Sequence, residues 1–446
     1  MAAILTALAM ACGPSQPPTG PKSRFPPSYE FANKCDDLAA KKQWVRSTLD
    51  EVYLWNDEIV DVDAGAYATP EAYYEALLVR TPTASGRPKD RWSNASPAAT
   101  QRFTFFHGVR WEFSAASDVE ALYVIPGTPA SDAGVLRGDR VAAIGGVPIE
   151  QLSPDVVSDA LFPAAPNQDI ALTLIGPGSG ARTVTMTDVP LDDPGVLLDT
   201  VIERPDGKVG YLAHTTQLGN DVADWQAAVN RFLDAGVSDL VVDIRYHPGG
   251  RSEDVAAAGA LIGGQALDGK VFAYATPNRR SQEALAAAGL PPQQPIPFGP
   301  QASSLGLHRV YFLTTLATCS AAELLINGMR PWLDVWQVGG ISCGKPYGFD
   351  EHTNCGTKYS IVAWQASNAL HQGDYTDGLV PRCAAEDDLS HALGDPAEGL
   401  LAAALSARDT GQCPPAGRGP APGSGSLLSR GAPPRPPRAP RPSAAR

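Results

Sequence analysis

The chain has 446 residues, of which 43% are hydrophobic, and a formal net charge of −13 at neutral pH. This length allows about three domains with cores of their own. No apolar run approaches the ~20 residues that a membrane-spanning helix needs, which excludes a multi-spanning membrane protein. An acidic body repels polyanions, so nucleic-acid binding is not expected.

The first residues resemble an export signal. The stretch MAAILTALAMAC is uncharged and apolar, ends at Cys12 and is followed by a proline-rich tether, so that residues 1–34 look like a bacterial lipoprotein signal. The usual basic start is missing, and Ala9 stands where leucine is usual. We expect an exported protein of the periplasm or cell envelope, anchored to the membrane through Cys12 if the signal is processed.

Residues 35–100 favour a small helical unit. Apolar residues recur at helical spacing from Cys35 to about Asn56. A second helix is indicated by Thr69-Pro70-Glu71, which supplies a cap residue, a first-turn proline and an acid at the positive end of the helix dipole.

Residues 102–190 change to short strands around the segment TPASDAGVLRGDRVAAIGG. Pro129-Ala130 opens a short helix and Gly145-Gly146 fits a hairpin turn. This pattern resembles a bacterial PDZ domain. The resemblance implies that the domain binds the end of an extended peptide, which adds as a strand to the edge of a sheet. The implied peptide-binding loop consists of Phe106, His107, Gly108 and Val109, with His107 expected to be solvated.

From residue 200 to 410, strands and helices alternate, which favours a mixed sheet flanked by helices. Helices are expected at 222–232, 254–262 and 321–330. The whole chain is therefore predicted to be an α+β or α/β multidomain protein with a helical unit, a PDZ domain and a β-α core. Residues 414–446 contain ten Pro, six Arg and no acidic residue, which predicts a disordered tail.

Six cysteines remain after export, an even number that can form three disulfides in an oxidising compartment. They form no CxxC pair and no Cys/His spacing typical of zinc, so neither a metal nor another cofactor is expected. Sequence alone leaves the connectivity open; the pairings considered are Cys343 with Cys355 and Cys35 with Cys413.

Ser320 follows a predicted buried strand and begins a helix that has Glu323 in its first turn. Free backbone N–H groups at such a junction can stabilise an oxyanion, although an ordinary N-cap serine gives the same pattern. Lys345 follows the next predicted strand. A desolvated lysine can be neutral and accept the serine proton, which favours a Ser/Lys pair.

Three segments, in this order, resemble the C-terminal processing peptidase family. The signature D-[LI]-R-x-N-x-G-G maps onto residues 243–250, T-x-S-A-x-E onto 318–323, and G-x-x-x-x-G-K onto 339–345. The ending DGLVPRCAAEDDLSHALGDP also looks like that of the family. With the PDZ pattern upstream, the resemblance covers most of residues 35–410.

The resemblance implies a serine endopeptidase that acts on protein or peptide substrates, with Ser320 as nucleophile and Lys345 as general base. The oxyanion hole would use the backbone N–H of Ala321 and that of Gly249 or Gly250. Structural support would come from Asp243, Arg245 and Glu323, the first two as a buried ion pair beside the glycine loop.

Two positions depart from the family pattern and indicate a divergent branch. Phe349 stands where a glutamine usually orients the lysine, and His247 stands where asparagine is usual. Pro346 restricts Lys345 to extended backbone conformations and can take the place of the missing glutamine.

Three alternatives remain. The first is a Ser/His/Asp arrangement, which would combine Ser320 and Asp243 with either His214 or His247. The spacing of these residues matches that of no family with such a triad. A catalytically silent peptide-binding protein is favoured by Phe349 and opposed by the retention of both Ser320 and Lys345. A third reading is a membrane-anchored scaffold that uses the Arg/Pro tail.

Overall fold

The computed structural model describes residues 24–98, 105–115, 117–163, 167–191, 194–215 and 221–415. Cys12 and most of the export signal and of the Arg/Pro tail lie outside these residues. No helix within them is long and apolar enough to cross a bilayer. The chain divides into two compact units, each built from several segments: Met1–Ala98, Tyr274–Pro295 and Tyr347–Ala366 in the first, and Ala99–Ala273, Ile296–Pro346 and Ser367–Arg446 in the second.

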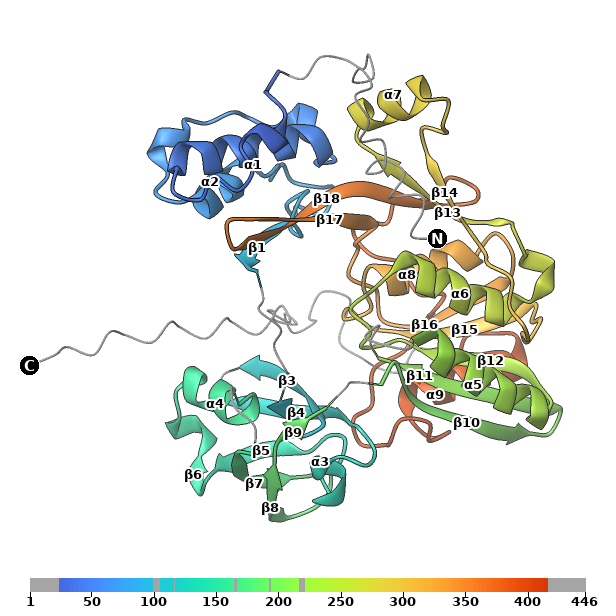
Figure 1. Ribbon diagram of the computed structural model, residues 1–446. Coiled ribbons are helices and arrows are strands. Elements are labelled where there is room, and N and C mark those ends of the chain that lie inside the picture. The colour runs from blue at the N-terminus through green and yellow to red at the C-terminus, as the bar shows by residue number, and fades with distance from the viewer. Residues whose placement is uncertain are drawn as a thin grey trace, which may run out of the picture. The chain divides into compact units, whose positions relative to one another are not determined.

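The first unit combines helices with a sheet (Figure 1). Its core is rich in aromatic side chains. Thr69 with Pro70 starts α2 (Pro70–Leu77), as the sequence predicts. The first predicted helix is α1 (Leu38–Val52), which is shorter than its apolar pattern and is capped by Asp37. The sheet has the order β1-β18-β13-β14, with β17 on β18, and α7 lies between β13 and β14 in the chain. These elements are β1 (Asn94–Pro97), β13 (Val271–Pro277), α7 (Arg279–Ala287), β14 (Gln294–Pro297), β17 (Tyr347–Asn354) and β18 (Thr357–Asn368).

The PDZ region of the second unit is an antiparallel sheet in the order β3-β4-β5-β7-β8, with β6 on β5 and a separate pair β2-β9. Its apolar residues alternate along the strands, as in Asp169–Ile175, and form their own core with α4. The elements are β2 (Phe105–Phe106), β3 (Val109–Ala115), β4 (Asp118–Val124), α3 (Pro129–Asp132), β5 (Arg140–Ile144), β6 (Val147–Pro148), α4 (Pro154–Leu161), β7 (Asp169–Ile175), β8 (Ala181–Thr187) and β9 (Val189–Pro190).

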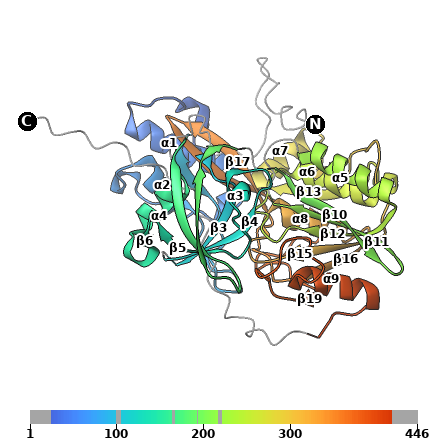
Figure 2. The same cartoon turned by 90° about the horizontal axis from the view of Figure 1, so that it is seen from below.

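The β-α core of the second unit is a six-stranded sheet in the order β10-β11-β12-β15-β16-β19. The first pair is antiparallel and the others are parallel. Helices α5, α6 and α8 cover one face and α9 covers the other (Figure 2). The elements are β10 (Val196–Arg204), β11 (Gly207–His214), α5 (Asp221–Ala235), β12 (Val237–Asp243), α6 (Ser252–Gly263), β15 (Arg309–Thr314), α8 (Ala321–Met329), β16 (Asp334–Gly339), β19 (Cys383–Ala384) and α9 (Gly399–Thr410).

The parallel pairing of β12, β15 and β16 determines where the loops after them lie. Parallel strands end at the same edge of a sheet, so the loops that follow these three strands meet there. The loops contain Gly249, Gly250, Ser320 and Lys345, and the predicted Ala321 and Glu323 lie in the first turn of α8, which follows the loop after β15.

Three disulfides are formed, and both pairings considered from the sequence are wrong. Cys35 pairs with Cys355, Cys319 with Cys343, and Cys383 with Cys413. Cys355 lies in the turn between β17 and β18, whereas Cys343 follows β16 and lies beside the loop after the neighbouring strand β15. The strand order of the two sheets, rather than distance along the chain, therefore decides the connectivity.

Candidate active site

Main-chain hydrogen bonds join the three loops at the edge of the parallel sheet. The N–H of Cys319 donates to the carbonyl of His247 over 3.0 Å, and the N–H of Cys343 donates to the carbonyl of Thr318, also over 3.0 Å. The glycine loop after β12, the serine loop after β15 and the lysine loop after β16 are therefore held together by backbone contacts.

Ser320 has an uncommon backbone conformation. It stands directly before α8 with φ +56° and ψ −117°, in a region that a residue with a Cβ rarely adopts. Such a conformation costs on the order of 1–3 kcal/mol and is concentrated at functional sites. The strand, sharp turn and helix resemble the turn that exposes the nucleophile in α/β-hydrolases. The residue is half-buried, so an incoming chain can reach it.

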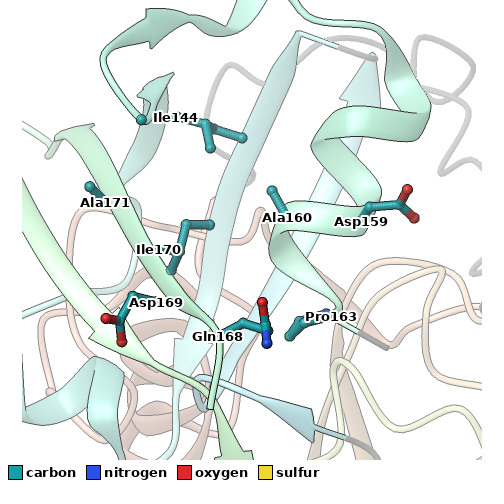
Figure 3. Close-up of a pocket in the computed structure, with 9 residues that line it drawn as sticks. Ile144, Asp159, Ala160, Pro163, Gln168, Asp169, Ile170 and Ala171 are labelled. Carbon is teal, nitrogen blue, oxygen red and sulfur yellow. The ribbon is translucent and has the colours of Figure 1, made fainter. Parts of the chain in front are cut away.

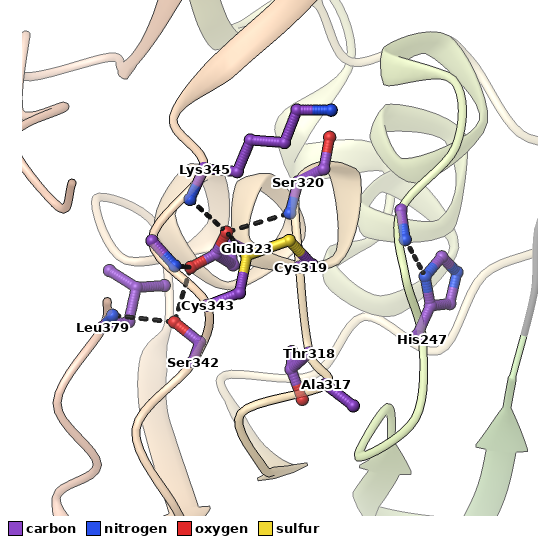
Figure 4. Close-up of a disulfide and its surroundings, with 12 residues drawn as sticks. His247, Ala317, Thr318, Cys319, Ser320, Glu323, Ser342, Cys343, Lys345 and Leu379 are labelled. Carbon is purple, nitrogen blue, oxygen red and sulfur yellow. Dashed lines mark hydrogen bonds between the residues drawn. A yellow bond between two sulfur atoms is a disulfide. The ribbon is translucent and has the colours of Figure 1, made fainter. Parts of the chain in front are cut away.

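Glu323 bridges the serine and lysine loops from a fully buried position (Figure 4). One carboxylate oxygen accepts from the backbone N–H of Ser320 over 2.9 Å and from that of Lys345 over 2.8 Å. The other accepts from the N–H of Gly344 over 2.8 Å and from the Ser342 hydroxyl over 2.6 Å. Burial raises the pKa of Glu323, and these four donors oppose that rise by stabilising the charged form.

Lys345 extends on the same side of Glu323 as Ser320, and the ends of both side chains converge in Figure 4. Gly344 lets the lysine loop pass close to the backbone of Thr376. It has φ +84°, and a Cβ there would lie 2.3 Å from the carbonyl oxygen of Thr376, so a residue with a side chain would displace the lysine loop. Lys345 is half-buried.

The glycine loop passes directly over the serine. Gly249 has φ +115°, and a Cβ there would lie 2.6 Å from the Cβ of Ser320. Its N–H donates to Nδ1 of His247 over 3.0 Å, so this group is already engaged. An oxyanion hole was expected to use the N–H of either Gly249 or Gly250, and the geometry favours Gly250. Ala321 is the first residue of α8, and a helix leaves its first N–H groups without intrahelical acceptors.

The Ser/His/Asp arrangement is not assembled. His247 is fully buried, and its burial lowers its pKa to about 3. Its ring lies edge-on to that of His214, with 4.3 Å between the centroids. The Asp243 carboxylate accepts from the hydroxyl of Tyr211 over 2.6 Å and pairs with Arg245. Among the described residues, no hydrogen bond joins His247 to Asp243 or to Ser320.

Arg245 is the centre of a buried ion network beneath the glycine loop. The expected pair with Asp243 is present at 2.7 Å. The guanidinium also contacts Asp387 at 2.6 Å and both carboxylate oxygens of Glu398 at 2.7 and 2.8 Å. Asp387 and Glu398 were not among the predicted residues, and the acidic stretch of the C-terminal family-like segment was the only sequence signal for them. The carbonyl of Arg245 accepts from the Thr315 hydroxyl, so the network also supports the serine loop.

The disulfide between Cys319 and Cys343 lies within this site (Figure 4). Both sulfurs approach Glu323, a grouping that could otherwise suggest metal ligands. Disulfide sulfurs carry no thiolate, and the oxygens of Glu323 already accept four hydrogen bonds. The residues present therefore do not fit a metal ion.

In the PDZ region, His107 was expected to be solvated, but the structure shows that it is buried. This prediction is therefore wrong. His107 is 2% exposed, and burial lowers its pKa against the opposing charge of Asp188. Its carbonyl accepts from the N–H of Ala130 over 2.9 Å. A Cβ at Gly108 would lie 2.2 Å from the Thr128 hydroxyl, so this loop packs tightly against the start of α3.

A separate hollow of about 430 Å³ lies between α4 and β7 (Figure 3). Ala160, Ile170 and Pro163 supply apolar walls, and Asp159 and Asp169 supply carboxylates. The predicted peptide-binding loop does not contribute to it.

Known proteins match several parts of the chain. Residues 40–94 match the family model for the peptidase S41 N-terminal domain, and residues 120–175 match that for the PDZ domain. A carboxyl-terminal-processing protease of Picosynechococcus sp. is 26% identical over 243 residues, which cover 53% of this chain and 54% of that protein. Over these segments the chain is similar to the C-terminal processing peptidases. A chloroplastic member of this family from Tetradesmus obliquus is 30% identical over 152 residues, 32% of this chain and 33% of that protein.

The chain therefore spans about half the length, or less, of the curated relatives it matches. A solved structure from Bacteroides fragilis, assigned to the S41 proteases, covers 83% of this chain and 97% of its own with a TM-score of 0.68 and 23% identity. The predicted fold class, with a helical N-terminal region, a PDZ domain and a β-sheet core, is confirmed.

Proposed function

We propose that the protein is a serine endopeptidase that uses Ser320 as nucleophile and Lys345 as general base. The observation that carries this proposal is the bridge made by Glu323, one of whose oxygens accepts from the backbone N–H of both residues. Two loops from different strands are thereby held with their functional side chains on one side of the same carboxylate.

The reaction follows from these positions. Lys345 Nζ takes the proton of the Ser320 hydroxyl while the oxygen attacks the peptide carbonyl. The resulting oxyanion accepts from the N–H groups of Ala321 and Gly250. The lysine ammonium then protonates the leaving amine, and the acyl-enzyme is hydrolysed by a water molecule that gives its proton to the same lysine.

The PDZ domain supports a proposal about substrates. A domain of this kind binds an extended chain end by strand addition, so we expect it to bind the C-termini of protein substrates or to control their access to the site. Three disulfides fit an oxidising compartment, which supports export to the cell envelope.

A catalytically silent peptide-binding protein is the second candidate. Phe349 favours it, because this side chain packs in the apolar cluster of the first unit where a lysine-orienting glutamine is usual in the family.

A serine-reactive fluorophosphonate tests the two proposals. The wild-type protein should be labelled and Ser320→Ala should not. Lys345→Arg keeps the charge but supplies no base, because arginine stays protonated, so we expect its labelling to fall at least about 100-fold. A folded wild type that takes up no label would overturn the peptidase proposal and favour the silent binder.

A further inference from the structure

We propose that the Cys319–Cys343 disulfide is a positioning element of the active site, which fixes Lys345 next to Ser320 in place of the glutamine usual in the family. This inference rests on the proposed Ser/Lys function. It concerns how the pair is held rather than which residues react.

The disulfide joins the two loops at the residues nearest to the proposed chemistry. Cys319 directly precedes Ser320, and Cys343 is separated from Lys345 only by Gly344. Their Cα atoms are 5.1 Å apart although the residues follow different strands, β15 and β16. The cross-link therefore limits how far the serine and lysine loops can separate.

The other connections between these loops are hydrogen bonds. Among them are the donation from the N–H of Cys343 to the carbonyl of Thr318 and the bonds that Glu323 accepts from Ser342, Gly344 and Lys345. Water can replace each of these bonds if the loops open, whereas a covalent link cannot exchange in this way. The position that could hold an orienting glutamine, Phe349, is part of an apolar cluster and offers no hydrogen bond from its side chain.

Removal of the link should let the lysine loop open toward solvent. The proposed general base must be neutral to act, and a lysine in water holds its proton more tightly than a desolvated one, so opening of the loop should leave less neutral lysine at pH 7. Removal of the disulfide should therefore slow the acylation of Ser320 and shift the pH profile of the acylation rate to higher pH. A role in stability alone would lower the melting temperature without moving the pH profile of the folded protein.

The chain supplies a matched control. The disulfide between Cys383 and Cys413 belongs to the same unit and closes a segment of similar length, with a sequence separation of 30 against 24. It joins β19 to the residues after α9, outside the serine and lysine loops. Its removal should lower the melting temperature by a similar amount, because the entropic effect of a cross-link depends on loop length.

The experiment compares Cys319→Ala/Cys343→Ala with Cys383→Ala/Cys413→Ala. Fluorophosphonate labelling rates are measured from pH 6 to 10 at a temperature where thermal unfolding shows both variants folded. We expect the first variant to react at least about 10-fold more slowly at pH 7, with the midpoint of its profile raised by about one pH unit. The control should stay within about 2-fold of the wild-type rate, with an unchanged midpoint.

Should the first variant not fold, Cys319→Val/Cys343→Ala fills more of the vacated space and carries the same expectation. Wild-type rate and midpoint in either folded variant, or equal losses in the control, would overturn the positioning role while leaving the peptidase proposal intact. Failure of both variants to fold while the control folds would assign the disulfide to stability and overturn the positioning role as well. An unlabelled wild type would refute the peptidase proposal itself, and this inference with it.

Discussion

Glu323→Gln tests the bridge between the serine and lysine loops. Each carboxylate oxygen of Glu323 accepts two hydrogen bonds, from the N–H groups of Ser320 and Lys345 on one side and from Gly344 and Ser342 on the other. A glutamine presents an oxygen on one side only. Its NH₂ group must therefore face either the N–H groups of Ser320 and Lys345 or the Gly344 N–H and the Ser342 hydroxyl. Of these four donors, only the Ser342 hydroxyl can rotate and accept a hydrogen bond instead.

The magnitude follows from the bonds that are lost. If the amide turns its NH₂ toward Ser342, the N–H of Gly344 loses its acceptor, and the remaining bonds lose the charge of the carboxylate. A buried donor without a partner costs about 1–3 kcal/mol, and hydrogen bonds to charged groups are worth about 1.5–3 kcal/mol. Relief of the desolvation of a buried charge offsets part of this. We expect about 2–4 kcal/mol less stability and at least about 10-fold slower acylation of Ser320.

Urea unfolding and fluorophosphonate labelling measure the two effects. Glu253→Gln is the matched control, because Glu253 is also an acid in the first turn of a helix but is exposed at the start of α6. It should change stability by less than about 0.5 kcal/mol and leave the labelling rate unchanged. If Glu323→Gln unfolds and reacts like the wild type, the carboxylate does not hold the two loops together and the argument for the site loses its main support.

Two further substitutions test the glycine loop and the buried histidine. Gly249→Ala places a Cβ against Ser320 at a backbone conformation that alanine avoids, and should slow labelling at least about 100-fold, whereas Gly236→Ala, at φ +73° with open space around it, should cost stability only. Equal labelling of the two alanine variants would show that the loop does not approach the nucleophile as described. The folded-state pKa of His247, about 3, lies below the ordinary value of about 6.5, so the unfolded state binds the extra proton and stability is lost as pH falls from about 6.5 toward 3. Lowering the pH from 6.5 to 5 should cost about 2 kcal/mol through this group, and His247→Gln should remove that part of the pH dependence in urea unfolding; a variant with the wild-type slope would contradict the assignment.

The ion network around Arg245 explains why the C-terminal segment belongs to the same structure as the glycine loop. Glu398 is fully buried, pairs with the guanidinium and accepts from the N–H of Leu401 at the start of α9. One carboxylate thus serves both as a helix cap and as a counter-ion to the loop that follows β12. Because removal of one partner leaves a buried charge unpaired, this network constrains both segments together.

The sequence by itself determined the elements of the site and their order. Strand patterns predicted that Ser320 and Lys345 follow neighbouring strands that end at one sheet edge, which agrees with the parallel pairing of β15 and β16. The glycine loop was assigned to the same site only because residues 243–250, 318–323 and 339–345 together resemble the family signatures. The helix cap Thr69 before α2 could also be predicted from the sequence, because a cap depends only on neighbouring residues.

Only the tertiary structure decided the partners that come from distant parts of the chain. The disulfide connectivity, the pairing of Arg245 with Asp387 and Glu398, the donors to Glu323 from the lysine loop and the burial of His107 and His247 all depend on which strands and loops become neighbours. Local spacing carries no information about such pairs, because their free energy arises from contacts between segments that the chain brings together only when it folds.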